Sequence, residues 1–265
     1  MKNGKVKLDV AGHVAVLTLN DPQALNVVSV AMLEDIQAAL DALEKPDSGV
    51  RCLILTGEGR GFCAGANLGG GISGKPGAKD SDAGDVLERW YHPILKRLRD
   101  LPFPMITAVN GVAAGVGMSF ALMGDMILAG RSSYFLQAFR RIGLVPDGGS
   151  TYLLPRLVGL ARAKELSLMA EKLPAEKALA WGLINRVHDD DALMEEARTL
   201  AAELAAGPTV ALGLIRKLYW NSPLNTYDEQ LELERQSQKV AGRTADFGEG
   251  VKAFFEKRPA EFKGE

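Results

Sequence analysis

The hydrophobic and polar positions of the first 60 residues predict a hairpin, a helix and a buried strand. Apolar and polar residues alternate over residues 6–19 around a turn at 11–12, the pattern of a β-hairpin. Apolar residues then recur every three or four positions over 33–43, and Ser29 is suited to cap a helix there. The short apolar run 52–56 predicts a strand covered on both faces.

Strands and helices continue to alternate through the middle of the chain. Residues 57–79 are rich in glycine and are expected to be a long loop. A helix is expected over residues 87–98, with Pro93 introducing a kink or an irregular start. Strands are expected at 105–109 and 126–129, separated by a glycine-punctuated buried helix at 112–124. That apolar stretch is shorter than the roughly 20 residues that a membrane-spanning helix needs. We therefore expect βαβ units of an α/β fold and no membrane segment.

From Asp190 onward the pattern is helical only. We therefore divide the chain into an α/β core over residues 1–200, which holds the reactive site, and a helical region over 201–265. The apolar positions of that region must be covered by the core or by another subunit.

Composition narrows the class of protein. The chain has 265 residues, 47% of them apolar and 24% charged, and a net charge of −2. These values are typical of a soluble globular protein and argue against a nucleic-acid partner. Two cysteines, Cys52 and Cys63, and three histidines support neither a disulfide framework nor a metal site. No targeting signal is apparent at the N-terminus, so we expect a cytoplasmic protein.

The chain is rich in glycine, with 29 residues, and three glycine-rich segments suggest familiar motifs. Residues 69–75 approach a phosphate-binding P-loop, but Pro76 stands where a serine or threonine would bind magnesium. Residues 115–117 begin like a dinucleotide-binding fingerprint, but Phe120 replaces its third glycine. Both matches are most simply coincidences.

The third segment, residues 117–121, approaches the nucleophile elbow of α/β-hydrolases. The order Ser119, Asp147, His188 agrees with the order of a hydrolase triad in such proteins. Ala121 replaces the final glycine of the motif, and Ser119 is equally suited to a tightly packed helix. A hydrolase thus remains an alternative.

Two further segments lead a buried strand into a turn of small residues. They are residues 62–68 and residues 108–117. Small side chains leave backbone N–H groups uncovered, and two such turns can direct two donors at one oxygen. This is how an oxyanion hole is made, and each donor supplies on the order of 3 kcal/mol of transition-state stabilisation.

Through these two segments and several later ones, the chain resembles the crotonase superfamily, the enoyl-CoA hydratase/isomerase family, over nearly its whole length. Residues 143–159, 180–184 and 249–259 are similar to later sequence blocks of that family. Residues 91–99 and 145–149 look most like its phenylacetate-pathway branch, which isomerises a ring-epoxide of phenylacetyl-CoA and shifts double bonds in enoyl-CoA.

The resemblance implies a crotonase-like spiral of ββα units with a C-terminal helical region for oligomerisation, in a homotrimer or a dimer of trimers. It implies a role in fatty acid or aromatic acid catabolism, an acyl-CoA thioester as the substrate, and no cofactor besides the coenzyme A that the substrate carries. The thioester carbonyl would be held by the N–H groups of Ala66 and Val116. The substrate-binding residues that we expect are Ala64, Asn67, Leu68, Gly115, Trp90, Tyr91, Phe139 and Lys257.

Three of these expectations have alternatives. Residues 69–79 and the following helix would form the wall of the acyl pocket, with Trp90 and Tyr91 touching an aromatic or branched acyl group, although both rings also suit a plain hydrophobic core. Lys257, and with it Lys263, would reach the CoA phosphates of a neighbouring subunit, or would simply be a solvated lysine.

The reaction type follows from departures from the family pattern. Hydratases of the family use two glutamates, and the corresponding positions here are Ser119 and Phe139. Asp147 matches the aspartate of the isomerase branches, and one carboxylate is enough to remove a proton and return it elsewhere. We expect Val145, Pro146 and Phe139 to desolvate Asp147 and raise its pKa.

An alternative role for Asp147 is to cap the helix that follows it. Besides the isomerase, three functions remain open: a hydratase with unusual catalytic groups, an acyl-CoA hydrolase, and a CoA-binding subunit without activity. Asp125, at the end of a buried helix, is expected to be a structural residue.

Overall fold

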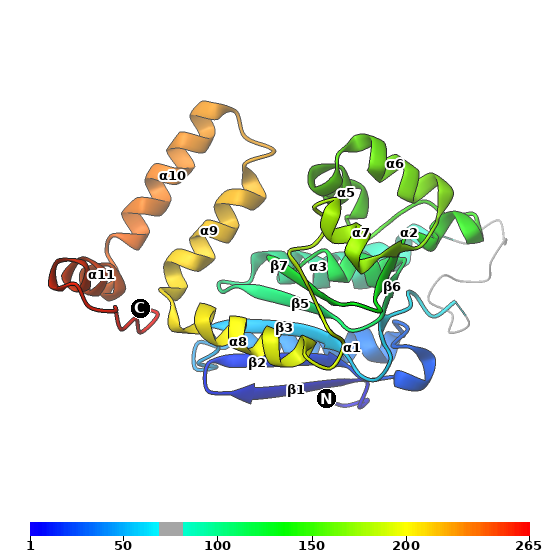
Figure 1. Ribbon diagram of the computed structural model, residues 1–265, viewed down its shortest axis with the longest axis horizontal. Coiled ribbons are helices and arrows are strands. Elements are labelled where there is room, and N and C mark those ends of the chain that lie inside the picture. The colour runs from blue at the N-terminus through cyan, green and yellow to red at the C-terminus, as the bar shows by residue number, and fades with distance from the viewer. Residues whose placement is uncertain (69–81) are drawn as a thin grey trace.

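The computed structural model describes residues 1–68 and 82–265, which form two β-sheets surrounded by helices (Figure 1). The strands are β1 (Val6–Ala11), β2 (Val14–Leu19), β3 (Cys52–Gly57), β4 (Gly61–Cys63), β5 (Met105–Val109), β6 (Val112–Ala114), β7 (Met126–Gly130), β8 (Tyr134–Leu136), β9 (Leu173–Pro174) and β10 (Arg186–His188). The helices and helical turns are η1 (Pro22–Ala24), α1 (Val30–Leu43), α2 (Ala83–Val86), η2 (Leu87–Tyr91), α3 (His92–Asp100), α4 (Val116–Ala121), η3 (Ala138–Ile142), α5 (Ser150–Val158), α6 (Leu160–Met169), α7 (Ala175–Ala180), α8 (Leu193–Ala206), α9 (Thr209–Asn221), α10 (Tyr227–Ala241) and α11 (Ala245–Glu256).

The two sheets are wound as a spiral. The larger sheet has the order β1-β2-β3-β5-β7-β10, and the smaller has the order β4-β6-β8-β9. The pairs β3 and β4, β5 and β6, and β7 and β8 each give one strand to either sheet before the chain turns back through helical segments. The expected spiral of ββα units is confirmed, as is the N-terminal hairpin β1–β2.

The larger sheet is covered on both faces, as the apolar run in β3 predicted. Cys52 and Ile54 pack with α8 in one cluster, whereas Leu53 and Leu55 pack with α1 and α4 in the main core. Figure 1 shows α8 lying along the sheet beside β2 and β3. Every residue of β3 is buried, because successive side chains of a strand point to opposite faces.

Two sequence expectations in the middle of the chain were wrong. The stretch 112–124 is not one helix, because β6 forms its start and α4 begins only at Val116. Gly115 separates them with φ +53° and ψ −129°, a backbone conformation that glycine adopts far more readily than other residues. Likewise, the segment that was expected to be a loop from residue 57 contains β4 at 61–63, which pairs with β6.

Other expected elements are present. Ser29 caps α1 by accepting a hydrogen bond from the Met32 N–H. The irregular helix start expected near Pro93 is the π-helical turn η2, which runs directly into α3. Helix α8 continues through residue 200, where we divided the chain, and α9–α11 extend away from the sheets (Figure 1).

Candidate active site

The turns after β4 and β6 meet across the smaller sheet. Gly65 adopts φ +110°, and a Cβ on it would lie 3.1 Å from the carbonyl oxygen of Ala114. A Cβ on Gly115 would lie 3.9 Å from the Cα of Gly65. The two glycine turns predicted from the sequence are therefore neighbours.

The direction of the Ala66 amide follows from its pairing with Val28. The Val28 N–H donates to the Gly65 carbonyl at 2.8 Å, and the Asn67 N–H donates to the Val28 carbonyl at 3.0 Å. Because backbone groups alternate sides along an extended segment, the amide of Ala66 between them points away from Val28. That amide is free of the pairing that holds the segment in place.

The second donor is the first residue of α4. The Met118 and Ser119 N–H groups bond back to the Gly115 carbonyl, whereas the first N–H groups of a helix have no partner within it. The N–H of Val116 is therefore available at a positive helix end. Gly117 lets this end approach β4, since a Cβ there would lie 2.2 Å from the Cys63 carbonyl oxygen.

Asp147 is fixed through its backbone. Its carbonyl oxygen accepts hydrogen bonds from the Ser119 Oγ at 2.9 Å, the Ser150 Oγ at 2.8 Å and the Ser150 N at 3.1 Å. Gly149 is the N-cap of α5, and no side chain caps that helix. The capping alternative for Asp147 was therefore wrong, because its carboxylate makes no hydrogen bond to the start of α5.

A close contact at Gly148 places Asp147 beside the second turn. A Cβ on Gly148 would lie 2.6 Å from the Ser119 Cβ and 3.5 Å from the Val116 Cγ2. Phe139 approaches from the other side, with its Cζ 3.9 Å from the Cβ position of Gly115. The structure thus gathers the predicted acid, both predicted amide donors and Phe139 around one point.

The Asp147 carboxyl is in an unusual environment. Its Oδ1 is buried and has no hydrogen-bond partner within residues 1–68 and 82–265, and burial raises the pKa of the carboxyl to about 6. The predicted direction of this shift is confirmed, but one predicted cause was wrong. Val145 is 78% exposed and cannot desolvate the carboxyl, whereas Phe139 is buried.

The other predicted site residues form an aromatic pair near Asp147 and a group of three around the first turn. Tyr91 is buried and close enough to Asp147 for the carboxylate charge to contribute to its raised pKa, and Trp90 packs against the core. Ala64 and Asn67 flank the first turn, and Leu68 follows it with an exposed side chain. The predicted pocket wall at residues 69–79 lies outside the described residues.

Lys257 is not brought to this site within the chain. It is exposed at the end of α11, which lies at the opposite end of the molecule from β6 (Figure 1). Any contact of Lys257 with substrate requires a second subunit.

The hydrolase triad is not assembled. The Ser119 hydroxyl is fully buried and donates a hydrogen bond to the Asp147 carbonyl, which is not a base that could activate it. His188 lies on β10, where its Nδ1 is 4.0 Å from the Glu196 carboxylate. Ser119 is the tightly packed polar residue of the alternative interpretation.

Sequence reasoning missed two asparagines that hold the connection from β3 to β4, the strand that leads into the first turn. The buried Asn26 amide donates to the carbonyls of Glu58 and Gly61, and the Asn110 amide donates to those of Gly57 and Gly59, at distances of 2.7 to 3.0 Å. The Asn-Gly pair at residues 110–111 was an available signal, since this dipeptide marks tight turns.

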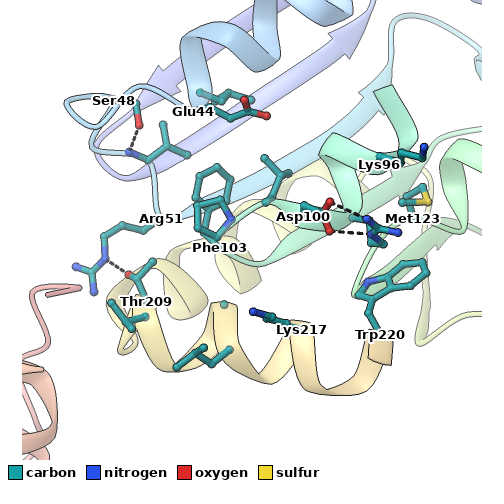
Figure 2. A pocket seen from close by; sticks show the side chains of 18 of the residues that line it. Glu44, Ser48, Arg51, Lys96, Asp100, Phe103, Met123, Thr209, Lys217 and Trp220 are labelled. Carbon is teal, nitrogen blue, oxygen red and sulfur yellow. Dashed lines mark hydrogen bonds and ion pairs between the residues drawn. The ribbon is translucent and has the colours of Figure 1, made fainter. Parts of the chain in front are cut away.

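A large groove lies away from most of these residues. It has a volume of about 1310 Å³ and runs between α9 and the ends of α1 and α3 (Figure 2). Arg51 and Thr209, joined by a hydrogen bond of 2.6 Å, close one side of it. Among the described residues that line it, only Gly148 and Gly149 adjoin Asp147.

A spiral of paired sheets that presents two amide donors and one buried carboxyl defines the crotonase class of acyl-CoA enzymes. The family model described as enoyl-CoA hydratase/isomerase matches residues 9–265, so the chain belongs to this family. It is similar to the 1,2-epoxyphenylacetyl-CoA isomerase of Escherichia coli, with 47% identity over 95% of either chain. It is also similar to a protein of Rhodobacter capsulatus described as a probable enoyl-CoA hydratase, with 40% identity over 98% of either chain.

Solved structures agree. A crystal structure of an enoyl-CoA hydratase from Bacillus anthracis matches with a TM-score of 0.90 and 31% identity, over 98% of this chain and all of that one. The crotonase fold is therefore confirmed by structure as well as by sequence. Within residues 1–68 and 82–265, no helix has the length and hydropathy that crossing a membrane requires, and no group of three or more potential ligands could hold a metal ion.

Proposed function

We propose that this enzyme isomerises an acyl-CoA thioester with Asp147 as its acid and base. The carboxylate removes a proton from the carbon next to the thioester carbonyl and returns it to another carbon of the acyl group. The N–H groups of Ala66 and Val116 stabilise the negative charge that the thioester oxygen gains in between. The observation that carries this proposal is the Asp147 carboxyl, with a pKa of about 6 and an Oδ1 that is buried and unpaired among the described residues, beside two glycine turns.

Isomerisation suits this site better than hydration. Adding water to a double bond calls for two proton-transfer groups near the reacting carbons. At the two positions where hydratases of the family carry glutamate, this chain has a Ser119 whose hydroxyl is held by a carbonyl and an apolar Phe139. The Asp147 carboxyl alone can move a proton between two carbons without consuming water.

The relatives support a choice of substrates. The similar E. coli protein is described as an isomerase of 1,2-epoxyphenylacetyl-CoA, so we propose a ring-epoxide thioester or a 3-enoyl-CoA as the substrate. Neither reaction needs a cofactor beyond the coenzyme A of the substrate itself. A cytoplasmic location stays a prediction. The two cysteines, which are free and buried, are compatible with it.

Mass spectrometry of the products tests the reaction type. Isomerisation leaves the substrate mass unchanged, hydration adds one water, and hydrolysis releases the CoA moiety. Asp147→Asn should abolish the double-bond shift in 3-hexenoyl-CoA while still binding the substrate, and Asp9→Asn, an exposed aspartate, serves as the matched control. Full isomerase activity in Asp147→Asn would overturn the proposal.

We further propose that α9–α11 join subunits into a homotrimer or a dimer of trimers. Large apolar side chains are exposed along these helices, and extensive exposed patches mark interfaces. They include Tyr219, Leu224, Tyr227, Val240, Phe247, Phe254 and Phe255. Light scattering should give three or six times the chain mass of 28.4 kDa, and Phe254→Asp should lower it. A monomeric wild-type protein would contradict this assembly.

A further inference from the structure

Tyr91 occupies a distinctive place beside the candidate base. It is the last residue of the π-helical turn η2 and is only 2% exposed. Its ring lies 6.4 Å from that of Phe120, on the helix that begins with Val116. Single π-helical turns inside helices are frequent at functional sites, and this one places the Tyr91 side chain in the core beside α4.

The Tyr91 hydroxyl has no hydrogen-bond partner among the residues that the structure describes, although it is fully buried. Burial, the neighbouring Cys63 and the Asp147 charge raise its pKa, so the phenol keeps its proton and can only be a neutral donor or acceptor. Buried hydroxyls are normally paired, and an unpaired one in a native site calls for an explanation.

Asp147 has the matching feature, since its Oδ1 is also buried and unpaired. Tyr91 packs against Phe120, and the adjacent Ser119 bonds the Asp147 backbone, which places Tyr91 near Asp147, yet no hydrogen bond joins their side chains. One bound molecule lying between them would therefore contact both. Such a molecule would present a C–H to the carboxylate and a hydrogen-bond acceptor to the phenol.

We propose that Tyr91 selects acyl-CoA substrates that carry an oxygen on the carbon next to the one that loses its proton, by donating a hydrogen bond to that oxygen. The inference rests on the proposed function. A ring-epoxide of a phenylacetyl thioester has its oxygen at this position, whereas a 3-enoyl-CoA has only carbon and hydrogen there. With the simple enoyl substrate the phenol stays unpaired, as it is in the free enzyme.

The role of Tyr91 is recognition. Its hydroxyl keeps its proton throughout, and the proton that moves in the reaction travels on Asp147. Removing the hydroxyl should therefore weaken the binding of oxygen-bearing substrates and leave the intrinsic proton transfer to a plain enoyl-CoA intact. A residue that merely supported the fold would affect both substrates alike.

Tyr91→Phe tests this directly, since it removes only an atom that has no partner. The value of kcat/KM with 1,2-epoxyphenylacetyl-CoA should fall tenfold or more, while the value with 3-hexenoyl-CoA should stay within twofold. Tyr134→Phe, a change of the same kind on β8, should alter neither. Equal effects of Tyr91→Phe on both substrates, or no effect on the epoxide, would overturn the proposal.

A binding measurement separates this proposal from the proposed function. In Asp147→Asn, calorimetry should show that 1,2-epoxyphenylacetyl-CoA binds more tightly than phenylacetyl-CoA, and the further change Tyr91→Phe should erase that preference. This readout measures binding in a variant that does not turn over the substrate, so it tests Tyr91 whatever reaction the wild-type Asp147 catalyses. An unchanged preference in the double variant would rule out recognition by the phenol.

Discussion

The Ser119 hydroxyl donates a hydrogen bond of 2.9 Å to the backbone carbonyl of Asp147. Ser119 lies on the helix that follows the second glycine turn, so this bond ties the candidate base to the element that supplies the Val116 amide. The same carbonyl also accepts two bonds from Ser150. The backbone of Asp147 is thus held by both serines, while its Oδ1 is left without a partner among the described residues.

The tight packing of Gly148 on Ser119 predicts a large effect of Gly148→Ala on activity. The new Cβ would lie 2.6 Å from the Ser119 Cβ, and Gly148 has φ +59°. The segment must shift, which displaces the Asp147 carboxyl from the two amide donors, and misplacement by about 1 Å can cost about 100-fold in rate. Steady-state kinetics with 3-hexenoyl-CoA measure this loss in kcat.

Gly159→Ala is the control for Gly148→Ala. Gly159 also has a positive φ, +80°, but a Cβ there meets nothing within 4 Å. Both variants carry the strain of a left-handed residue, about 1 to 3 kcal/mol, and only Gly148→Ala carries the clash. If both variants lose activity equally, the packing of Gly148 is not what places the base.

The raised pKa of Asp147 predicts the pH dependence of the reaction. A carboxyl that acts first as a base must be ionised, so kcat/KM should rise with pH through about 6 and level off above it. An aspartate with the ordinary value of 3.8 would give a profile that is already flat at pH 5. Initial rates between pH 4.5 and 8 in buffers of constant ionic strength decide between the two.

The same shift predicts that Asp147 destabilises the fold at neutral pH. Its pKa is higher in the folded chain than in the unfolded chain, so its contribution to stability is fully present below about pH 3.8 and is lost as the pH rises through about 6. Asp147→Asn should therefore be more stable than wild type at pH 7, by at most about 3 kcal/mol at 1.36 kcal/mol per pKa unit. Urea unfolding at pH 5 and pH 7 measures this difference, and a gap that does not widen with pH would contradict it.

Gly117 and Gly248 should respond oppositely to alanine. A Cβ on Gly117 would lie 2.2 Å from the Cys63 carbonyl oxygen, so Gly117→Ala must separate α4 from β4 and should cost about 2 to 4 kcal/mol. Gly248 lies inside α11 with open space around it, and Gly248→Ala should add about 0.5 to 1 kcal/mol. Thermal melts of both variants check the pair, and a neutral Gly117→Ala would show that the contact between α4 and β4 is loose.

The sequence predicted the larger sheet better than the smaller one. Strands such as β3 and β5 are mostly apolar along their whole length, which is the pattern expected of a strand buried on both faces. The stretch 112–124 was misassigned because an apolar run gives no sign of where a strand ends and a helix begins. That boundary depends on pairing with β4 and β8, which are distant in the chain.

The candidate site was predictable where backbone conformation decides it. Gly65 and Gly115 stand out in the sequence because few other residues tolerate their turns, and the structure places them together. The surroundings of Asp147 were less predictable, since the exposure of Val145 depends on the path of residues 143–147. Tyr91 could be recognised as an aromatic residue at helical spacing, but its unpaired hydroxyl appears only in three dimensions.

The C-terminal helices are attached to the core through an ion pair between the buried Arg216 of α9 and the partly exposed Asp125, which predicts a loss of stability in Arg216→Met. The Arg216 side chain is only 4% exposed, and it binds the Asp125 carboxylate and the carbonyl of Leu98. Asp125 also accepts a bond of 2.7 Å from the Met105 N–H, as expected of a structural residue. Removing the guanidinium leaves the Leu98 carbonyl and the partly exposed Asp125 carboxylate without their donor, so Arg216→Met should cost about 1 to 3 kcal/mol of unfolding free energy.

The double variant Arg216→Met/Asp125→Asn separates this cost from lost packing. It removes the Asp125 charge that Arg216→Met leaves unpaired, so it should recover part of the stability lost in Arg216→Met. Arg235→Met breaks only the exposed pair with Glu232 and should cost less than about 1 kcal/mol. Urea titrations give all three values. If Arg216→Met unfolds at the wild-type urea concentration, the ion pair does not hold α9 to the core, and the exposed apolar side chains of α9–α11 must instead position these helices through contacts with other subunits.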